Sequence, residues 1–331
     1  MIFFVTTKRH NYTIRKCLNT CGKPLEGVVE PMCYGNLLIR RTLAHGTYVL
    51  SDLERLSSSD LNSLINFYDT VSNIPEIRVL NHPTRTLRRF DLLRLLYEKQ
   101  INSFNAFRLE DDPKPGRFPV FIRGEDDHKG PLSELVESQA KLEDAILLWK
   151  SRWGGLKRKI VTEHLDVSDR DGVYRKYSAF CIGGRIIPRH LFFGSSWCVK
   201  AWELMASELL EEERRYIETN PHESKLKEIF QLAGVEFGRI DYGVHQGQIQ
   251  VWEINTNPML PVNYGGGGPR RQWIHDWFAT EFESAMRAIN LPTDGRVRLS
   301  RRAIPIWAAA KIPCGLVYRR ITRGERKKHV A

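Results

Sequence analysis

Two acidic residues near the C-terminal third of the chain have a spacing that could hold a divalent cation. Asp241 and Glu253 belong to the string FGRIDYGVHQGQIQVWEINTNP, residues 237–258. Two extended runs flank His-Gln-Gly-Gln, and Gly247 can adopt the positive φ that a short hairpin loop requires. A turn centred on Gly247 would place Asp241 opposite Glu253 on neighbouring strands.

The same register predicts which side chains share the face of the two acids. Arg239 would lie opposite Asn255, and because side chains alternate along a strand, all four polar residues would share one face. The opposite face would be an apolar set suited to a core, made of Ile240, Tyr242, Val244, Trp252 and Ile254.

Directly opposed carboxylates repel each other, at a cost on the order of 1 kcal/mol even when exposed. A divalent cation removes this repulsion, and Mg²⁺ prefers carboxylate oxygens together with the phosphate oxygens of a nucleotide. Asn255 would add a neutral oxygen, and Arg239 a positive charge beside the phosphates. The alternative is a solvated hairpin whose acids pair with arginines, which is common on protein surfaces.

The elements before the hairpin predict a small α/β unit followed by mixed structure. A strand at Ile2–Thr6, helical periodicity at 60–68 and the strand-like EIRVLNHP favour a partly parallel sheet. Thr86 is then expected to cap a helix with an apolar stripe. Further along the chain we expect the strand PVFIR, the loop GEDDHKG, a helix at 132–149, the strand KIVTEHLD, the paired strands YSAFCIGG and RIIPRHLFF, and helices at 200–232 and 273–289.

The arrangement R-x-D with a later E-x-N, continuing into asparagine and proline, resembles the metal-binding end of the ATP-grasp superfamily, in its carboxylate–amine or carboxylate–thiol ligase type. The resemblance implies an α+β fold in which two α+β subdomains clasp ATP, preceded by a small α/β pre-grasp domain. It implies that Asp241, Glu253 and Asn255 hold Mg²⁺ on the ATP phosphates. Arg239 matches the arginine that steadies an acyl phosphate.

Preceding segments resemble the family in the same order. PVFIRGEDDHKG resembles the first grasp strand and its phosphate-covering loop, and IVTEHLDV resembles the hinge strand that meets adenine. The implied roles are Glu163 and Leu165 beside the base, Asp166 or Asp169 at the ribose, and Lys176 and Arg189 at the phosphates or the acyl group. The implied domains are 1–108 (pre-grasp), 109–190 and 191–290 (grasp subdomains) and 291–331 (basic tail).

The chain departs from the family at the phosphate contacts. Where two lysines are common, it has Arg88 or Arg89, and Arg123, and an arginine fork does not replace a lysine point charge one for one. The loop GEDDHKG is acidic, and Lys129 would compensate for that charge. These departures leave the metal ligands better supported than the nucleotide-loop residues.

The resemblance implies a Mg²⁺-dependent ligase that uses ATP to convert a substrate carboxylate into an acyl phosphate, which an amine or another nucleophile then attacks. Two alternatives remain open. One is an ATP-grasp kinase that phosphorylates a hydroxyl group, and the other is a degenerate, non-catalytic ATP-grasp binding protein. The formal net charge of +11 favours an anionic substrate.

Composition also bears on whether the chain is a membrane, secreted, zinc-binding or nucleic-acid-binding protein. The 331 residues exceed one small core, and no segment has the apolar length of a membrane span. The N-terminus lacks a signal-peptide pattern, so a cytoplasmic location is expected. The six cysteines are expected to be free thiols rather than a zinc site. The basic tail allows nucleic-acid binding, which we do not favour, and the sequence does not predict the oligomeric state.

Overall fold

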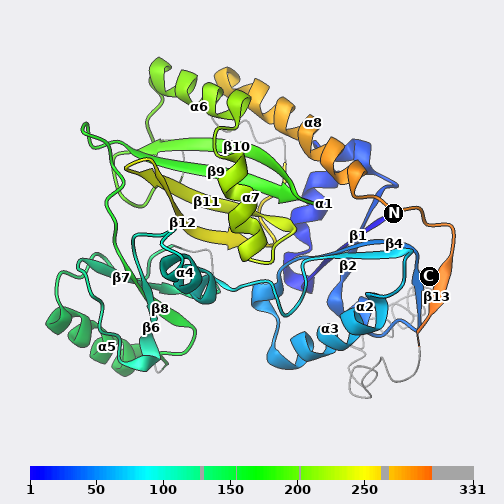
Figure 1. Ribbon diagram of the computed structural model, residues 1–331, viewed down its shortest axis with the longest axis horizontal. Helices are drawn as coiled ribbons and strands as arrows, with labels where there is room; N and C mark the ends of the chain where they lie inside the picture. Colours follow the sequence, from blue (N-terminus) through cyan, green and yellow to red (C-terminus); the bar gives the residue numbers. More distant parts are fainter. Residues whose placement is uncertain (127–129, 154, 201–202, 262–267, 300–331) are drawn as a thin grey trace, which may run out of the picture.

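The computed structural model describes residues 1–331 except 127–129, 154, 201–202, 262–267 and 300–331. The N-terminal part is a parallel sheet of order β2-β1-β4-β5 with helices around it (Figure 1). Its strands are β1 (Ile2–Thr6), β2 (Val29–Cys33), β4 (Gly46–Leu50) and β5 (Ile77–Leu80), and its helices are α1 (Tyr12–Leu18), α2 (Tyr34–Leu38) and α3 (Ser58–Val71). Every residue of β1 is buried, which is why its sequence is almost continuously apolar.

The second sheet is antiparallel, with order β6-β8-β7. Its strands are β6 (Ala106–Arg108), β7 (Val120–Gly124) and β8 (Lys159–Glu163), and α5 (Gln139–Trp153) packs on it. The helix begins later than the predicted residue 132, so that boundary was wrong. The backbone of Leu132 and Val136 instead hydrogen-bonds to Ile122 and Val120, which makes this stretch an extended neighbour of β7.

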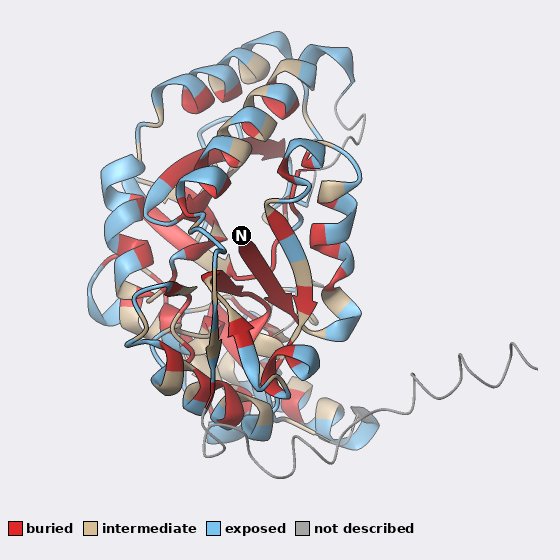
Figure 2. Ribbon diagram, turned by 90° about the vertical axis from the view of Figure 1, so that its right-hand side faces the viewer, coloured by how far each residue is buried: buried red, intermediate tan, exposed pale blue. Residues whose placement is uncertain are grey.

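The third sheet is antiparallel, with order β10-β9-β11-β12. Its strands are β9 (Tyr174–Ile182), β10 (Arg185–Gly194), β11 (Phe237–His245) and β12 (Gln248–Asn255). One face packs on α4 (Arg89–Glu98) and α7 (Glu223–Leu232), and the other meets α8 (Gln272–Ala288) and the N-terminal sheet. In Figure 2 the strands in the interior are mostly coloured as buried, and the helices expose their outer faces.

Two helical predictions need correction. The α4 helix has Arg88 at its N-cap, whereas the hydroxyl of Thr86 donates to the carbonyl of Gly234 at 2.9 Å, so Thr86 joins two segments instead of capping the helix. The region predicted as one helical stretch at 200–232 contains α6 (Ser207–Thr219) and α7, separated by Asn220 in a left-handed conformation.

The predicted fold class agrees with the structure: two α+β units, built on the second and third sheets, follow a small α/β unit. Two of the expected domain limits do not. Residue 190 lies inside β10, which pairs with β9, and β6 at 106–108 belongs to the second sheet. The short strand β13 (Arg296–Arg298) pairs with β3 (Thr42–Ala44), so the segment expected as a tail begins in contact with the N-terminal unit.

Candidate active site

The hairpin of β11 and β12 has the predicted register at its polar end. Arg239 lies opposite Asn255, and Asp241 lies opposite Glu253. Gln246 and Gly247 form the loop with φ values of 50° and 78°, as a two-residue turn with positive φ at both positions requires. The predicted opposition of the two carboxylates is confirmed.

The register changes immediately beyond the acids. Tyr242 pairs with Val251, so Trp252 is an extra residue that forms a β-bulge. Because of this bulge, Trp252 lines the cavity and packs beside Leu165, and its prediction as a member of the hairpin's core face was wrong. A Cβ at Gly243 would lie 2.9 Å from the Cζ2 atom of Trp252, so glycine there leaves room for the indole.

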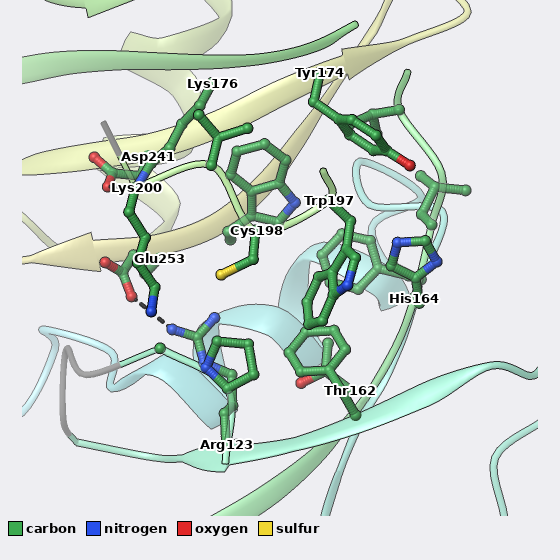
Figure 3. Close-up of a pocket in the computed structure, with 18 of the residues that line it drawn as sticks. Arg123, Thr162, His164, Tyr174, Lys176, Trp197, Cys198, Lys200, Asp241 and Glu253 are labelled. Carbon is green, nitrogen blue, oxygen red and sulfur yellow. Dashed lines mark hydrogen bonds and ion pairs between the residues drawn. The ribbon is translucent and has the colours of Figure 1, made fainter. Parts of the chain in front are cut away.

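The acids line a cavity of about 350 Å³ between the second and third sheets. Figure 3 shows Arg123 and Thr162 on the side of the second sheet and Lys176, Asp241 and Glu253 on the other. Aromatic side chains form one part of the wall and charged side chains the other. The aromatic residues are Phe104, Phe121, His164, Tyr174, Trp197 and Trp252, and the charged ones are Arg123, Glu163, Lys176, Lys200, Arg239, Asp241 and Glu253.

Asp241 is almost fully buried, with a relative exposure of 1%. Its carboxylate lies 3.0 Å from Lys176 Nζ and 2.9 Å from Arg239 Nε, and it accepts a hydrogen bond from Ser178 Oγ at 3.1 Å. Burial by itself raises the pKa of this carboxyl group, but the positive charges of Arg239 and Lys176 outweigh burial and hold the pKa below its usual value. The group is therefore an anion at neutral pH.

Glu253 has basic partners from other elements. Arg89, in the first turn of α4, donates to Glu253 Oε2, and Arg123 Nη2 on β7 donates to the same oxygen at 2.9 Å. The side chain of Arg89 is 4% exposed and also donates to the carbonyl of Gly124 at 2.6 Å. The two opposed carboxylates are thus offset by basic side chains, as in the alternative interpretation of the hairpin, although Asp241 is buried rather than solvated.

Glu163 lines the cavity, and its carboxylate is held by the backbone of a neighbouring segment. Its carboxylate accepts hydrogen bonds from the backbone N–H groups of Gly116, Arg117 and Asn105 at 3.0, 3.1 and 2.9 Å. The side chain therefore holds the segment 105–117 against the end of β8. Leu165 lines the same cavity.

Two of the expected site residues do not line the cavity, and a third lies outside the described residues. Asp169 accepts backbone hydrogen bonds from Asp171 and Val173 at 2.9 Å and pairs with Arg175, so it orders its own loop. Arg189 lies on β10, one strand further from the cavity than Lys176 on β9. Lys129 lies outside the described residues. Neither Asp169 nor Arg189 is among the residues that line the cavity.

Other cavity residues were missed by sequence reasoning. Trp197, Cys198 and Lys200 come from the segment after β10, and Thr162 from β8. The ring of Trp197 lies 4.9 Å from that of Phe121 and 5.5 Å from that of His164. No motif marks this segment, because its contribution depends on how it folds back over the cavity.

The donors present fit a hard divalent cation. Within the described ranges no group of three or more His, Cys, Asp and Glu side chains could bind a metal, so any site must combine fewer acids with other oxygens. Asp241 and Glu253 supply two carboxylates, and Asn255 an amide whose oxygen also accepts from the backbone of Asn257 at 2.8 Å. Two carboxylates plus phosphate and water oxygens form a common Mg²⁺ ligand set.

Two further predictions concern membrane-spanning helices and the cysteines. None of the helices in the described part of the chain is long and apolar enough to cross a membrane. Cys17, Cys21, Cys33, Cys181 and Cys198 are free thiols, as expected.

No protein-family model and no curated protein matches this chain. Solved structures similar to it include D-alanine–D-alanine ligase from Bacillus anthracis (13% identity, TM-score 0.49, 87% of this chain and 98% of that one). Others are D-alanine–D-alanine ligase from Helicobacter pylori (14%, 0.46, 88% and 100%) and L-amino acid ligase from Bacillus licheniformis (11%, 0.39, 77% and 66%).

Proposed function

We propose that this chain is an ATP-dependent ligase of the ATP-grasp type, which activates a substrate carboxylate for attack by an amine or another nucleophile. The observation that carries the proposal is the opposition of Asp241 and Glu253, with Arg239 and Asn255 beside them, in the wall of a cavity between two sheets. A repulsive acidic pair has a clear use where a divalent cation joins a nucleotide to the protein.

The two kinds of wall suggest how ATP would lie. The base would occupy the aromatic part of the cavity, between Leu165 and Trp252 on one side and Phe121 and Trp197 on the other. The phosphates would extend toward the charged part, where Arg123, Lys176, Lys200 and Arg239 gather. This orientation brings the terminal phosphate near Asp241 and Glu253. Asp169 is not part of this proposed arrangement. We keep Lys129 as a proposed contact of the phosphates.

Asp241, Glu253 and Asn255 would hold Mg²⁺, which when bound offsets charge on the phosphate oxygens. A carboxylate oxygen of the substrate would attack the terminal phosphorus, and ADP would leave. The amine would then attack the carbonyl carbon of the acyl phosphate, phosphate would leave, and the amine would lose a proton. Arg239 is fixed by its ion pair with Asp241, so its charge is positioned before the reaction for the negative transition state.

The proposal is tested by product formation. The purified protein is incubated with MgATP and a panel of carboxylates and amines, and ADP release is measured by a coupled assay. A ligase should release ADP rapidly only when both a carboxylate and a nucleophile are present. Release that needs only a hydroxyl compound, with phosphate transferred to it, would identify a kinase instead.

A second candidate is a non-catalytic ATP-grasp protein that binds a ligand without turnover. The specific observation in its favour is that Arg89 and Arg123 hold Glu253 while no metal is needed to offset its charge. An active enzyme would require Glu253 to leave these partners or to share its two oxygens between them and Mg²⁺. Retained nucleotide binding without ADP release across the panel would favour this candidate.

A further inference from the structure

A row of side chains runs across three strands of the third sheet, starting from Asp241 in the cavity wall. His190 on β10 lies opposite Ser178 on β9, and Ser178 lies opposite Asp241 on β11. The hydroxyl of Ser178 donates to Asp241, so this row faces the same side of the sheet as the two acids. A register shift between Pro188 and His190 leaves Arg189 as the extra residue next to the row.

Arg189 is partly buried, and among the described residues it has no acidic partner of the kind that buried guanidinium groups usually have. In the described part of the chain its contacts are a ring nitrogen of His275 at 3.3 Å and the ring of Phe278 at 4.6 Å, and no carboxylate pairs with it. Burial, together with repulsion from Arg239 and Arg271, lowers the pKa of Arg189 to about 10. An anionic ligand would relieve both effects.

His190 offers a second unsatisfied group at the same place. The residue is 7% exposed, and its Nε2 atom is buried without a hydrogen-bond partner among the described residues. The ring stacks on Phe192 with 3.7 Å between ring centres. Burial, together with the charges of Arg239 and Arg189, lowers its pKa well below the usual value, so the ring is neutral and can donate one hydrogen bond.

The charges in this region do not balance. The charged groups that act on Arg189 and His190 include Arg239, Arg271, Lys176 and Glu213, and the basic groups outnumber the acidic one. Glu213 is occupied by Arg271, and Asp241 by Lys176 and Arg239. An unpaired positive charge in a partly buried place is unfavourable, and an anionic ligand bound beside Arg189 would offset it.

We infer that Arg189 and His190 bind a second anionic group of the substrate, so that the substrate is a dicarboxylic acid rather than a monocarboxylic one. This inference rests on the proposed function, because it assigns the first carboxylate to the group activated beside Arg239. The triphosphate does not account for the two residues, since neither lines the cavity that would hold the nucleotide. They lie one strand beyond Lys176, toward α8.

The test uses the full-length protein saturated with Mg²⁺ and a non-hydrolysable ATP analogue, so that the phosphate contacts are already occupied. Succinate, glutarate and adipate are then titrated by calorimetry, with butyrate as the monocarboxylate of similar size. At least one of the three should bind about ten-fold more tightly than butyrate, which corresponds to about 1.4 kcal/mol. Equal or weaker binding of all three relative to butyrate overturns the inference.

Substitutions of Arg189 and Arg185 test whether the preference for a dicarboxylate depends on Arg189. Arg189→Gln should remove the preference for the dicarboxylate while leaving the affinity for the ATP analogue unchanged, and Arg189→Lys should retain part of it. Arg185→Gln is the matched control, because Arg185 is on the same strand but pairs with Glu281 at the exposed surface. Circular dichroism establishes that each variant is folded.

The outcomes separate this inference from the proposed function. Loss of analogue affinity in Arg189→Gln would assign Arg189 to the phosphates and overturn the inference. If the wild type does not bind the analogue, the proposed function fails, and the same titration without nucleotide still tests the anion site. In that case a dicarboxylate preference that disappears in Arg189→Gln, but not in Arg185→Gln, supports the site by itself.

Discussion

Asp241 and Glu253 lie directly opposite each other on β11 and β12, yet their charges are offset from different directions. Lys176 and Arg239, from the same sheet, bind Asp241, whereas Arg89 and Arg123 reach Glu253 from α4 and the second sheet. The two acids therefore connect elements that must also surround a nucleotide, and substituting either acid changes both the charge and the assembly of the cavity.

We predict that Asp241→Asn weakens Mg²⁺-dependent binding of an ATP analogue by at least about 100-fold, because a ligand oxygen and its charge are lost together. The substitution also leaves Lys176 and Arg239 without a buried anion, so the free energy of unfolding should fall by about 3 kcal/mol. Calorimetry and urea denaturation measure the two effects. Asp171→Asn, at an exposed position, is the control and should change neither.

The contribution of Asp241 to stability should depend on pH in a defined direction. Arg239 and Lys176 hold the pKa of Asp241 in the folded protein below 3.8, the ordinary value for an aspartate side chain, although burial alone would raise it. The ionised carboxylate therefore stabilises the fold above pH about 4, and this stabilisation is lost as the pH falls through the lower pKa of the folded state. Urea denaturation between pH 2 and about 6 should show the wild type and Asp241→Asn converging at the acidic end. A difference that stays constant over this range contradicts the assignment.

Gly243 should act through Trp252. Gly243→Ala places a methyl group 2.9 Å from Cζ2 of the indole, which must move within the cavity wall. We expect nucleotide affinity to fall by about ten-fold, or 1.4 kcal/mol, with a change in tryptophan fluorescence. Gly155→Ala is the control, because nothing lies within 4 Å of a Cβ at that glycine. Unchanged affinity in Gly243→Ala would mean that Trp252 does not limit the base site.

Substitution of Glu163 should lower the stability of the protein more clearly than it lowers nucleotide affinity. Glu163→Gln weakens acceptance of three backbone hydrogen bonds from the 105–117 segment, which should lower the free energy of unfolding by about 1–3 kcal/mol. Nucleotide affinity should fall less than in Asp241→Asn, because the backbone of the hinge remains. The exposed Glu110→Gln is the control in both measurements. A stable variant that has lost nucleotide binding would instead place Glu163 at the base.

The opposition of Asp241 and Glu253 could be predicted from a short turn near Gly247, although the two-residue loop of Gln246 and Gly247 gives this pairing only together with the bulge at Trp252. The bulge at Trp252 could not, since it inserts one residue without any change in composition, and an apolar residue at that position reads as core. The limit was similar at Arg189. Its type and order along the chain suggested a contact with the phosphates or the acyl group, whereas Arg189 lies at a register shift on β10 and is not among the residues that line the cavity.

Contacts made by side chains from distant segments were the least predictable. Asp169 looked available for a ribose, yet its own loop offers closer backbone donors, which a carboxylate accepts locally. Likewise, the basic partners of Glu253 come from residues 89 and 123, which only the folded arrangement brings together. Trp197 and Lys200 carry no motif, and only the path of the chain after β10 brings them to the cavity.

The most direct test of the central claim is calorimetric titration of the purified protein with a non-hydrolysable ATP analogue, with and without Mg²⁺. The account predicts binding that strengthens by at least about ten-fold (1.4 kcal/mol) when Mg²⁺ is present. Glu253→Gln and Asp241→Asn should each remove that Mg²⁺ dependence in a folded protein. Analogue binding that is identical with and without Mg²⁺, or unchanged in both variants, would contradict the assignment of the opposed carboxylates as the metal–nucleotide site.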